Sequence, residues 1–174
     1  YPDCPPHATW IEPFEWLGGD VSKYPSAISG AHSKFRLHSQ LNSSLIRNYA
    51  EIANREPALI SPATAKARGI KTGDVVRIYN DRGEILCGAL VSDTAQDNVV
   101  IVSEGAWYDP AVWGVRSLCN NGNIHVQTRD VPSSQLSQSN TAQTSMVPIE
   151  NSKRDLQSVP EFERPVTLEA SALM

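Results

Sequence analysis

The sequence predicts a mainly β domain in which short strands close into a barrel. Short apolar runs bounded by turn residues occur at 75–79, 85–91 and 99–105. The clear helix signal, at 61–69, is about two turns long. A parallel sheet covered on both faces would instead need long helices between successive strands. A barrel with inserted turns therefore fits the pattern better than an open α/β sheet.

Residues 1–30 are rich in proline, glycine and aromatic residues and show no sustained helical or strand period. We interpret them as an irregular arm or linker from an upstream domain. Trp10, Phe14 and Trp16 would be exposed if this segment contacted nothing. They either pack on the chain's own barrel or await a partner surface, and the sequence leaves both alternatives open.

The helix at 61–69 has a signal at each end. Ser61 is suited to the N-cap, Pro62 to the first helical position and Gly69 to the C-terminal cap. After it, residues 75–91 predict a β-hairpin whose turn is NDRG, and we expect Gly83 to supply a positive φ there.

A third strand is predicted for VVIVSEG at 99–105, and its apolar run suggests burial on both faces. TSMVPIE, residues 144–150, predicts a final strand, which places the polar stretch 133–145 between ordered elements. The barrel would then span residues 31–150. Residues 151–174 mix charges and prolines, and we expect an extended C-terminal arm that wraps the barrel.

Length and charge exclude several classes of protein. The chain has 174 residues, of which 40% are hydrophobic, so it can bury a core. Its net charge of -4 and 15 scattered Lys and Arg residues argue against a nucleic-acid partner. No apolar run approaches the roughly 18 residues of a membrane span, so membrane insertion is not expected. Because the chain lacks an initial Met and a signal peptide, we expect a fragment of a longer protein, in which any export signal would lie upstream.

The cysteines and the common catalytic motifs add further exclusions. Cys4, Cys87 and Cys119 are odd in number and far apart, which predicts neither a disulfide framework nor a CxxC metal site. We expect Cys87, in EILCGALV, to be a small buried residue. The sequence has no GxSxG, HExxH, GxGxxG or P-loop pattern. We therefore predict no catalytic residue and no metal ligand in this chain.

Four polar loops remain as candidate sites. They are dense in Ser, Asn, Gln and His, whose uncharged donors and acceptors suit a neutral, heteroatom-rich ring system. The alternative is that they are solvated turns in which Asn and Gly serve the backbone. The loops are HSKFRLHSQ (32–40), SEGAWYDP (103–110), CNNGNIHVQT (119–128) and SSQLSQSNT (133–141).

Five blocks in order resemble the C-terminal domain of the dimethyl sulfoxide reductase family, with the closest likeness to trimethylamine N-oxide, dimethyl sulfoxide and biotin sulfoxide reductases. The resemblance covers about residues 3–150 and, in the tail, ERPVTLEA. It implies a six-stranded double-psi β-barrel. The blocks are HSKFRLHSQLNSS, NREPALISPATAKARGIKTGDVVRIYNDRGEILCGALVSD, SEGAWYDP, SLCNNGN and SQLSQSNTA.

The resemblance implies that the domain caps a bis(molybdopterin guanine dinucleotide) molybdenum cofactor. Arg36 would bind the diphosphate with its planar fork, and Gln138 would contact the pterin or guanine. Arg55 and Glu56 match the family as well; we interpret them first as structural, fixing the loop before the strand and helix, with cofactor contact as the alternative. The residues that the resemblance places at the cofactor are His32, Arg36, His38, Ser39, Gln40, Asn123, His125 and Gln138.

One loop departs from the family's pattern. After the Leu-Cys pair the family usually has Gly-Asn/Asp-Pro-Asn, whereas this chain has Gly122, Asn123, Ile124 and His125. His125 replaces the second Asn, which would be a cofactor contact, and its side chain has a different reach. Asn123 then remains as the polar anchor of the family's pattern in this loop.

The function that the resemblance implies is reduction of an N-oxide or S-oxide by oxygen-atom transfer. The metal would usually be held by a serine of another domain, so the isolated domain should be inactive. Upstream domains of the same polypeptide and an electron-donating cytochrome would be its partners. A full-length relative would be exported folded to the periplasm and serve anaerobic respiration.

Two other interpretations stay open. A free-standing barrel that acts as a binding or interaction module predicts that residues 1–30 pack on the barrel and that no sizeable apolar face is exposed. A domain of a formate dehydrogenase or nitrate reductase type of enzyme would share the barrel, but it fits SEGAWYDP and SQLSQSN less well.

Overall fold

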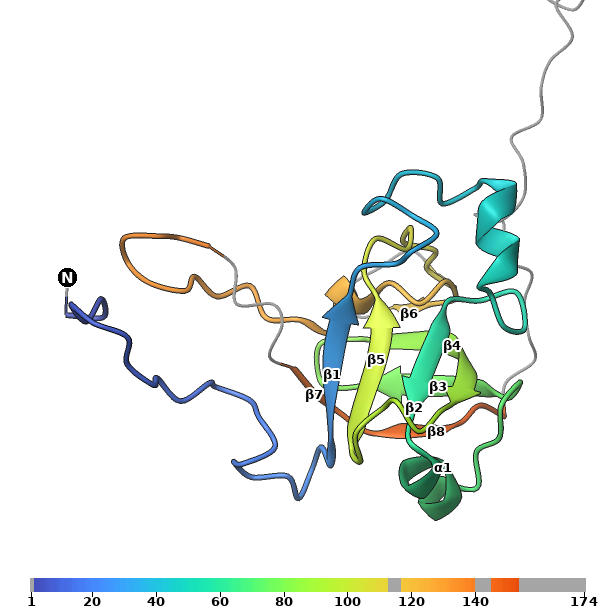
Figure 1. Ribbon diagram of the computed structural model, residues 1–174, viewed down its shortest axis with the longest axis horizontal. Helices are drawn as coiled ribbons and strands as arrows, with labels where there is room; N and C mark the ends of the chain where they lie inside the picture. Colours follow the sequence, from blue (N-terminus) through green and yellow to red (C-terminus); the bar gives the residue numbers. More distant parts are fainter. Residues whose placement is uncertain (1, 113–116, 140–144, 154–174) are drawn as a thin grey trace, which may run out of the picture.

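The fold was obtained as a computed structural model that describes residues 2–112, 117–139 and 145–153 (Figure 1). Most of the elements are short strands. In chain order they are β1 (Ser26–Ala31), the 3-10 helix η1 (Leu45–Tyr49), β2 (Pro57–Ile60), α1 (Pro62–Arg68), β3 (Val75–Tyr79), β4 (Glu84–Val91), β5 (Val99–Ser103), β6 (Leu118–Cys119), the 3-10 helix η2 (Ile124–Gln127), β7 (Ser145–Val147) and β8 (Ile149–Asn151).

The strands form one sheet in the order β7-β1-β5-β2-β4-β3-β8, with β6 paired to β4. The outermost strands of this order, β7 and β8, are separated in sequence by Pro148 alone. The chain itself therefore joins the two edges, and the sheet curls into a nearly closed barrel (Figure 1). The prediction of a mainly β barrel is confirmed.

The number of strands differs from the expected six for two local reasons. Pro148 has no amide hydrogen for the ladder and divides the predicted final strand into β7 and β8. The two-residue β6 is the other addition. If β6 is set aside and β7 and β8 are counted as one interrupted strand, six strands remain of the eight.

The core lies inside the barrel and is built from small branched side chains. In β5, Val100 and Val102 are fully buried, whereas Val99 and Ile101 are half-buried. The expected burial of both faces of this strand is therefore wrong, because its outer face is only partly covered. The main core residues are Ile28, Ala58, Ile60, Val76, Ile78, Ile85, Cys87, Ala89, Val100, Val102 and Val147.

The buried cysteines behave as core residues. Cys87 is fully buried, as predicted, and Cys119 is buried too. Burial raises the pKa of the Cys87 thiol well above its ordinary value, and it also raises that of Cys119. Both thiols therefore stay protonated at neutral pH.

Helix α1 has the ends that its sequence predicted. The Ser61 hydroxyl accepts a hydrogen bond from the Thr64 amide at 3.1 Å, and Gly69 closes the helix with φ +64°. The same hydroxyl donates to Asp97 at 2.5 Å, which ties the helix to the turn before β5.

Replacing Ser61 by Ala should lower the free energy of unfolding by about 1–2 kcal/mol, because the N-cap bond is lost. Thermal and urea unfolding of the chain would measure this. Ser92→Ala is a suitable comparison, because its exposed hydroxyl serves only a turn. Equal effects of the two substitutions would contradict a capping role for Ser61.

The hairpin turn between β3 and β4 forms where it was predicted, but its glycine has a different purpose. Gly83 does not have a positive φ, so that expectation was wrong. A Cβ at this position would lie 2.7 Å from the carbonyl oxygen of Val126. Glycine is required here because the turn lies directly against η2.

The N-terminal segment ends earlier than predicted, because residues 26–31 form β1. Ser26 and Ile28 alternate inward, but the run SAISGA consists mainly of small residues and carries a weak strand signal. Strand β1 is stabilised by parallel pairing with β5 and antiparallel pairing with β7.

Residues 2–25 extend away from the barrel (Figure 1). Trp10 and Phe14 are 72% and 67% exposed, so neither ring is buried against the barrel, although the Arg129 guanidinium lies 4.5 Å from the centre of the Phe14 ring. Trp16 is half-buried. The attachment is polar: Arg82 donates to both carboxylate oxygens of Glu15, at 2.6 and 2.9 Å. Burial alone would raise the pKa of Glu15, but the hydrogen bonds from Arg82 and the Met146 amide outweigh it and lower that pKa.

The expected C-terminal arm, residues 151–174, falls mainly outside the described residues, which end at 153. Within the described part of the chain, no helix combines the length and the apolar composition needed to cross a bilayer.

Candidate cofactor-binding site

Parallel pairing of β1 and β5 brings two predicted loops to the same edge of the sheet. Ala31 pairs with Ser103 in the register, so His32 and Glu104 directly follow paired residues. The Glu104 amide also donates to the Ala31 carbonyl at 2.9 Å, which continues the contact by one residue. The loops 32–40 and 103–110 therefore start side by side.

A cavity of about 470 Å³ lies between these loops and the one before η2. It contains four residues that the sequence predicted as cofactor contacts: His38, Ser39, Asn123 and His125. The full lining is His38, Ser39, Glu104, Gly105, Ala106, Trp107, Tyr108, Asn123 and His125.

The two sides of the cavity are held together by close backbone contact. The indole Nε1 of Trp107 donates to the Ser39 carbonyl at 2.8 Å. Gly105 has φ +88°, and a Cβ there would lie 2.1 Å from the carbonyl oxygen of His38. Glycine is therefore required both by its conformation and by the space.

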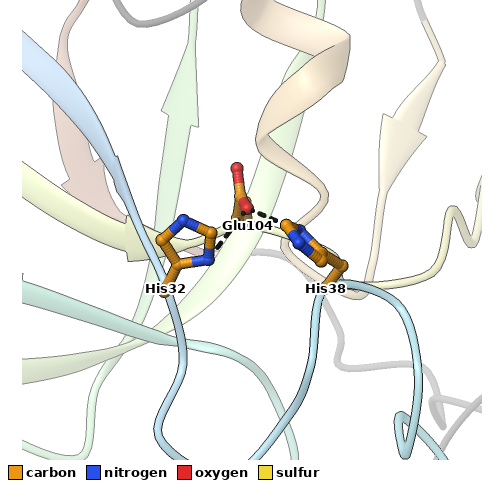
Figure 2. Close-up of side chains that lie close together, drawn as sticks. All are labelled: His32, His38 and Glu104. Atoms are coloured by element: carbon orange, nitrogen blue, oxygen red, sulfur yellow. Dashed lines mark hydrogen bonds and ion pairs between the residues drawn. The ribbon is translucent and has the colours of Figure 1, made fainter.

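Figure 2 shows three polar side chains that converge beside the cavity. The imidazoles of His32 and His38 both point to the carboxylate of Glu104, with Nδ1 to Oε1 distances of 3.3 and 3.0 Å. The two rings lie edge to face with centroids 5.1 Å apart. The sequence predicted both histidines but not the carboxylate that joins them.

The structure gives Arg36 a different role from the expected diphosphate contact. Its side chain is 1% exposed, and all three guanidinium nitrogens donate within the protein. The acceptors are the His38 carbonyl at 3.1 Å, Glu56 at 2.6 Å and the Glu104 carbonyl at 2.7 Å. Arg36 therefore fixes the backbone of the cavity wall, because each of its three guanidinium nitrogens donates to a group inside the protein.

Glu56 is the centre of a buried polar network under the loops. Its Oε2 accepts from Arg36 and also from Arg47, at 3.1 Å. Arg47 in turn donates to Asn121 at 3.0 Å and to Asn42. The structural role expected for Glu56 agrees with these contacts.

The network continues into the cavity wall. The side-chain amide of Asn121 donates to the Trp107 carbonyl at 2.8 Å. At the far side of the cavity, the Asn123 side-chain oxygen accepts from the His125 amide at 3.0 Å and caps η2. Hydrogen bonds of this network therefore connect at least three of the loops around the cavity.

Besides Arg36, three predicted residues lie outside the lining of this cavity. His32 lines a neighbouring cavity of about 450 Å³ on the outer face of the sheet. Gln40 is exposed, and its backbone amide donates to Leu37 at 2.9 Å. Gln138 belongs to a segment that extends away from the barrel beside the N-terminal residues (Figure 1), and its side-chain amide donates to the Gln135 carbonyl at 2.9 Å.

Five lining residues were missed as individual site residues: Glu104, Gly105, Ala106, Trp107 and Tyr108. All lie in SEGAWYDP, which was recognised as a polar loop. The available signal was their position immediately after a predicted strand, where loops from neighbouring parallel strands meet.

Residues 27–146 match the family model described as "Molydopterin dinucleotide binding domain". The chain belongs to this family. The loops that build the cavity lie inside the matched range. The resemblance inferred from the five sequence blocks is thereby confirmed.

Several curated relatives of this dinucleotide-binding domain are much longer proteins. This chain is 45% identical over 166 residues to dimethyl sulfoxide/trimethylamine N-oxide reductase of Cereibacter sphaeroides, and the alignment covers 95% of this chain and 20% of that protein. It is 47% identical over 154 residues to trimethylamine-N-oxide reductase 1 of Escherichia coli K12, covering 86% and 18% respectively. The chain thus spans about a fifth of the length of these relatives.

The fold also occurs in a solved structure of low sequence similarity. Acetylene hydratase from Pelobacter acetylenicus superimposes with a TM-score of 0.65 and 15% identity, covering 83% of this chain and 21% of the hydratase. At that identity the likeness shows the shared fold alone.

Proposed function

We propose that this chain is the cofactor-binding domain of a molybdenum-dependent reductase of N-oxides or S-oxides. The observation that carries the proposal is the convergence of His38, Ser39, Asn123 and His125 on one cavity in a member of this domain family. The domain would hold part of a bis(molybdopterin guanine dinucleotide) cofactor. The relatives with this activity in their names support the choice of substrate class.

The residues present fit such a group. Pterin and guanine are flat rings with many uncharged donors and acceptors, and the cavity offers hydroxyl, amide and imidazole groups of the same kind. Trp107 and Tyr108 add aromatic side chains to the lining. The bound cofactor supplies oxygen-atom transfer at molybdenum, whereas this chain binds and orients the dinucleotide.

We assign the predicted contacts different roles within this proposal. His38, Ser39, Asn123 and His125 would contact the cofactor in the cavity. His32, Gln40 and Gln138 would contact portions that extend beyond it. Arg36 would act indirectly, because it holds the backbone of His38 and Glu104.

The partners proposed for this domain are upstream domains of the same polypeptide. Support comes from the length of the relatives and from the exposed rings of Trp10 and Phe14. The same exposure disfavours a free-standing barrel, which predicts that these rings are covered. An electron-donating cytochrome, a periplasmic location and a place in anaerobic respiration complete the proposal.

Titration of the chain with GDP, followed by amide chemical shifts, tests the cofactor role. We expect shifts that cluster on residues 38–39, 104–108 and 123–125, with an affinity that His38→Ala weakens. His7→Ala serves as the control, because His7 lies outside the cavity lining. Shifts confined to other surfaces, or equal affinity of both variants, would contradict the proposed site.

A further inference from the structure

We infer that Arg82 is a positioning residue that couples the N-terminal segment, residues 2–25, to η2, the 3-10 helix that carries His125 into the cavity lining. The guanidinium of Arg82 contacts three parts of the chain that lie far apart in the sequence: the N-terminal segment, the end of η2 and the start of β7. The coupling is a property of these contacts within the chain, whereas its consequence for a cofactor rests on the proposed function.

The Arg82 guanidinium divides its donors between these parts. Nη1 and Nη2 donate to the two carboxylate oxygens of Glu15, at 2.6 and 2.9 Å. Nε donates to the Gln127 carbonyl at 2.6 Å, and Nη2 also donates to the Ser145 hydroxyl at 3.0 Å. A planar fork with five N–H donors makes these contacts at the same time, which the single ammonium group of a lysine cannot do.

Glu15 is held by the barrel as well as by Arg82. Its Oε2 accepts from the Met146 amide at 2.9 Å. Met146 lies in β7, an outermost strand of the sheet order, so the carboxylate supplies an acceptor to an edge strand. Arg129 adds a second positive group, with its Nη1 3.9 Å from Oε1 of Glu15. Charge-assisted hydrogen bonds therefore fix the N-terminal segment to the barrel at this residue.

The end of η2 is positioned by the same cluster. A 3-10 helix of four residues has little stability of its own, so its place depends on tertiary contacts. Three donors converge on the Gln127 carbonyl: Arg82 Nε at 2.6 Å, the Asn80 side-chain amide at 2.9 Å and the Ser145 hydroxyl at 2.9 Å. His125 precedes Gln127 by two residues and lines the cavity. A shift at this end of η2 therefore moves a cavity residue.

Both sets of contacts are made by one rigid planar group. A displacement of Glu15 therefore changes the position of the Arg82 guanidinium at Gln127 as well. The N-terminal segment, which we interpret as the linker from an upstream domain, is thus connected to the cavity through a single side chain. The position of that segment would adjust how His125 meets the cofactor.

Amide hydrogen exchange and chemical shifts of the ligand-free chain test the coupling. Glu15→Gln keeps the size of the side chain but removes its charge. We expect the Met146 amide to exchange at least about fivefold faster, because its acceptor is weakened, and the amide resonances of residues 123–127 to shift. Arg82→Lys keeps the positive charge but lacks the fork, so it should shift the same resonances. In the GDP titration, Glu15→Gln should weaken binding about 3–30-fold, the range of coupling between connected sites.

Glu12→Gln is the matched control, because Glu12 lies in the same segment and accepts from Trp16 of that segment at 3.0 Å. It should leave the resonances of residues 123–127 and the GDP affinity unchanged. Faster exchange at Met146 in Glu15→Gln with unmoved resonances at 123–127 would overturn the coupling, and so would equal effects of the two substitutions.

The ligand-free measurements separate this inference from the proposed function. If the unchanged chain bound no GDP, the proposed function would be contradicted, while the resonances of residues 123–127 would still decide the coupling. Circular dichroism would check that the variants are folded.

Discussion

Replacement of Glu56 by Gln should lower the free energy of unfolding by about 3–5 kcal/mol, the usual cost of removing one partner from a buried ion pair. Glu56 accepts hydrogen bonds from both Arg36 and Arg47, whose side chains are only 1% and 2% exposed. Without the carboxylate, two buried guanidinium groups lose their shared negative partner. Urea unfolding of the variant and the unchanged chain measures the difference.

The control is Glu150→Gln, which removes one carboxylate from a surface pair with Arg77. Glu150 is 50% exposed, and such pairs contribute at most about 1 kcal/mol. If Glu56→Gln cost no more than Glu150→Gln, the network would not stabilise the fold. A loss of GDP affinity in a Glu56 variant that remains folded would show in addition that the network shapes the cavity.

Gly105→Ala should displace the loop 38–40 from the loop 104–108 and weaken GDP binding by at least about tenfold, or about 1.4 kcal/mol. The new Cβ would meet the His38 carbonyl at 2.1 Å. A backbone atom cannot move aside by rotating a side chain, so the loops must separate. Ser39 and Trp107, which share a hydrogen bond across this contact, would move apart.

Gly73→Ala is the matched control for this substitution. Gly73 has a similar positive φ of +96°, but no atom lies within 4 Å of the Cβ that alanine would add. Both variants carry a conformational cost of about 1–3 kcal/mol. Only Gly105→Ala should also lose GDP affinity, measured by the same titration. Equal GDP affinity of the two variants would contradict the proposed role of the loop contact.

Local sequence signals predicted the elements whose stabilising contacts are also local. Helix α1 begins at the residue after Ser61 and is closed by Gly69, because its caps are made by neighbouring residues. The β3–β4 hairpin follows from a turn sequence between two apolar runs. By contrast, β1 was missed, since its small residues are stabilised by strands about 70 and 120 positions further along the chain.

The candidate site, too, was predicted in part and missed in part. The sequence blocks indicated the loops, and four of the predicted residues share one cavity. Arg36 shows the limit of this approach. Its type suggested an anion contact, but a type does not reveal whether the donors face a ligand or a buried carboxylate such as Glu56.

The sequence by itself determined the barrel class, the capped helix and the membership in a dinucleotide-binding family, because these depend on residue order and short-range periodicity. The tertiary structure decided that His32, His38 and Glu104 meet and that Arg36 supports the cavity from below. The physical reason is the parallel register of β1 and β5, which brings residues about 70 positions apart to one edge of the sheet. No local pattern in either loop specifies that register.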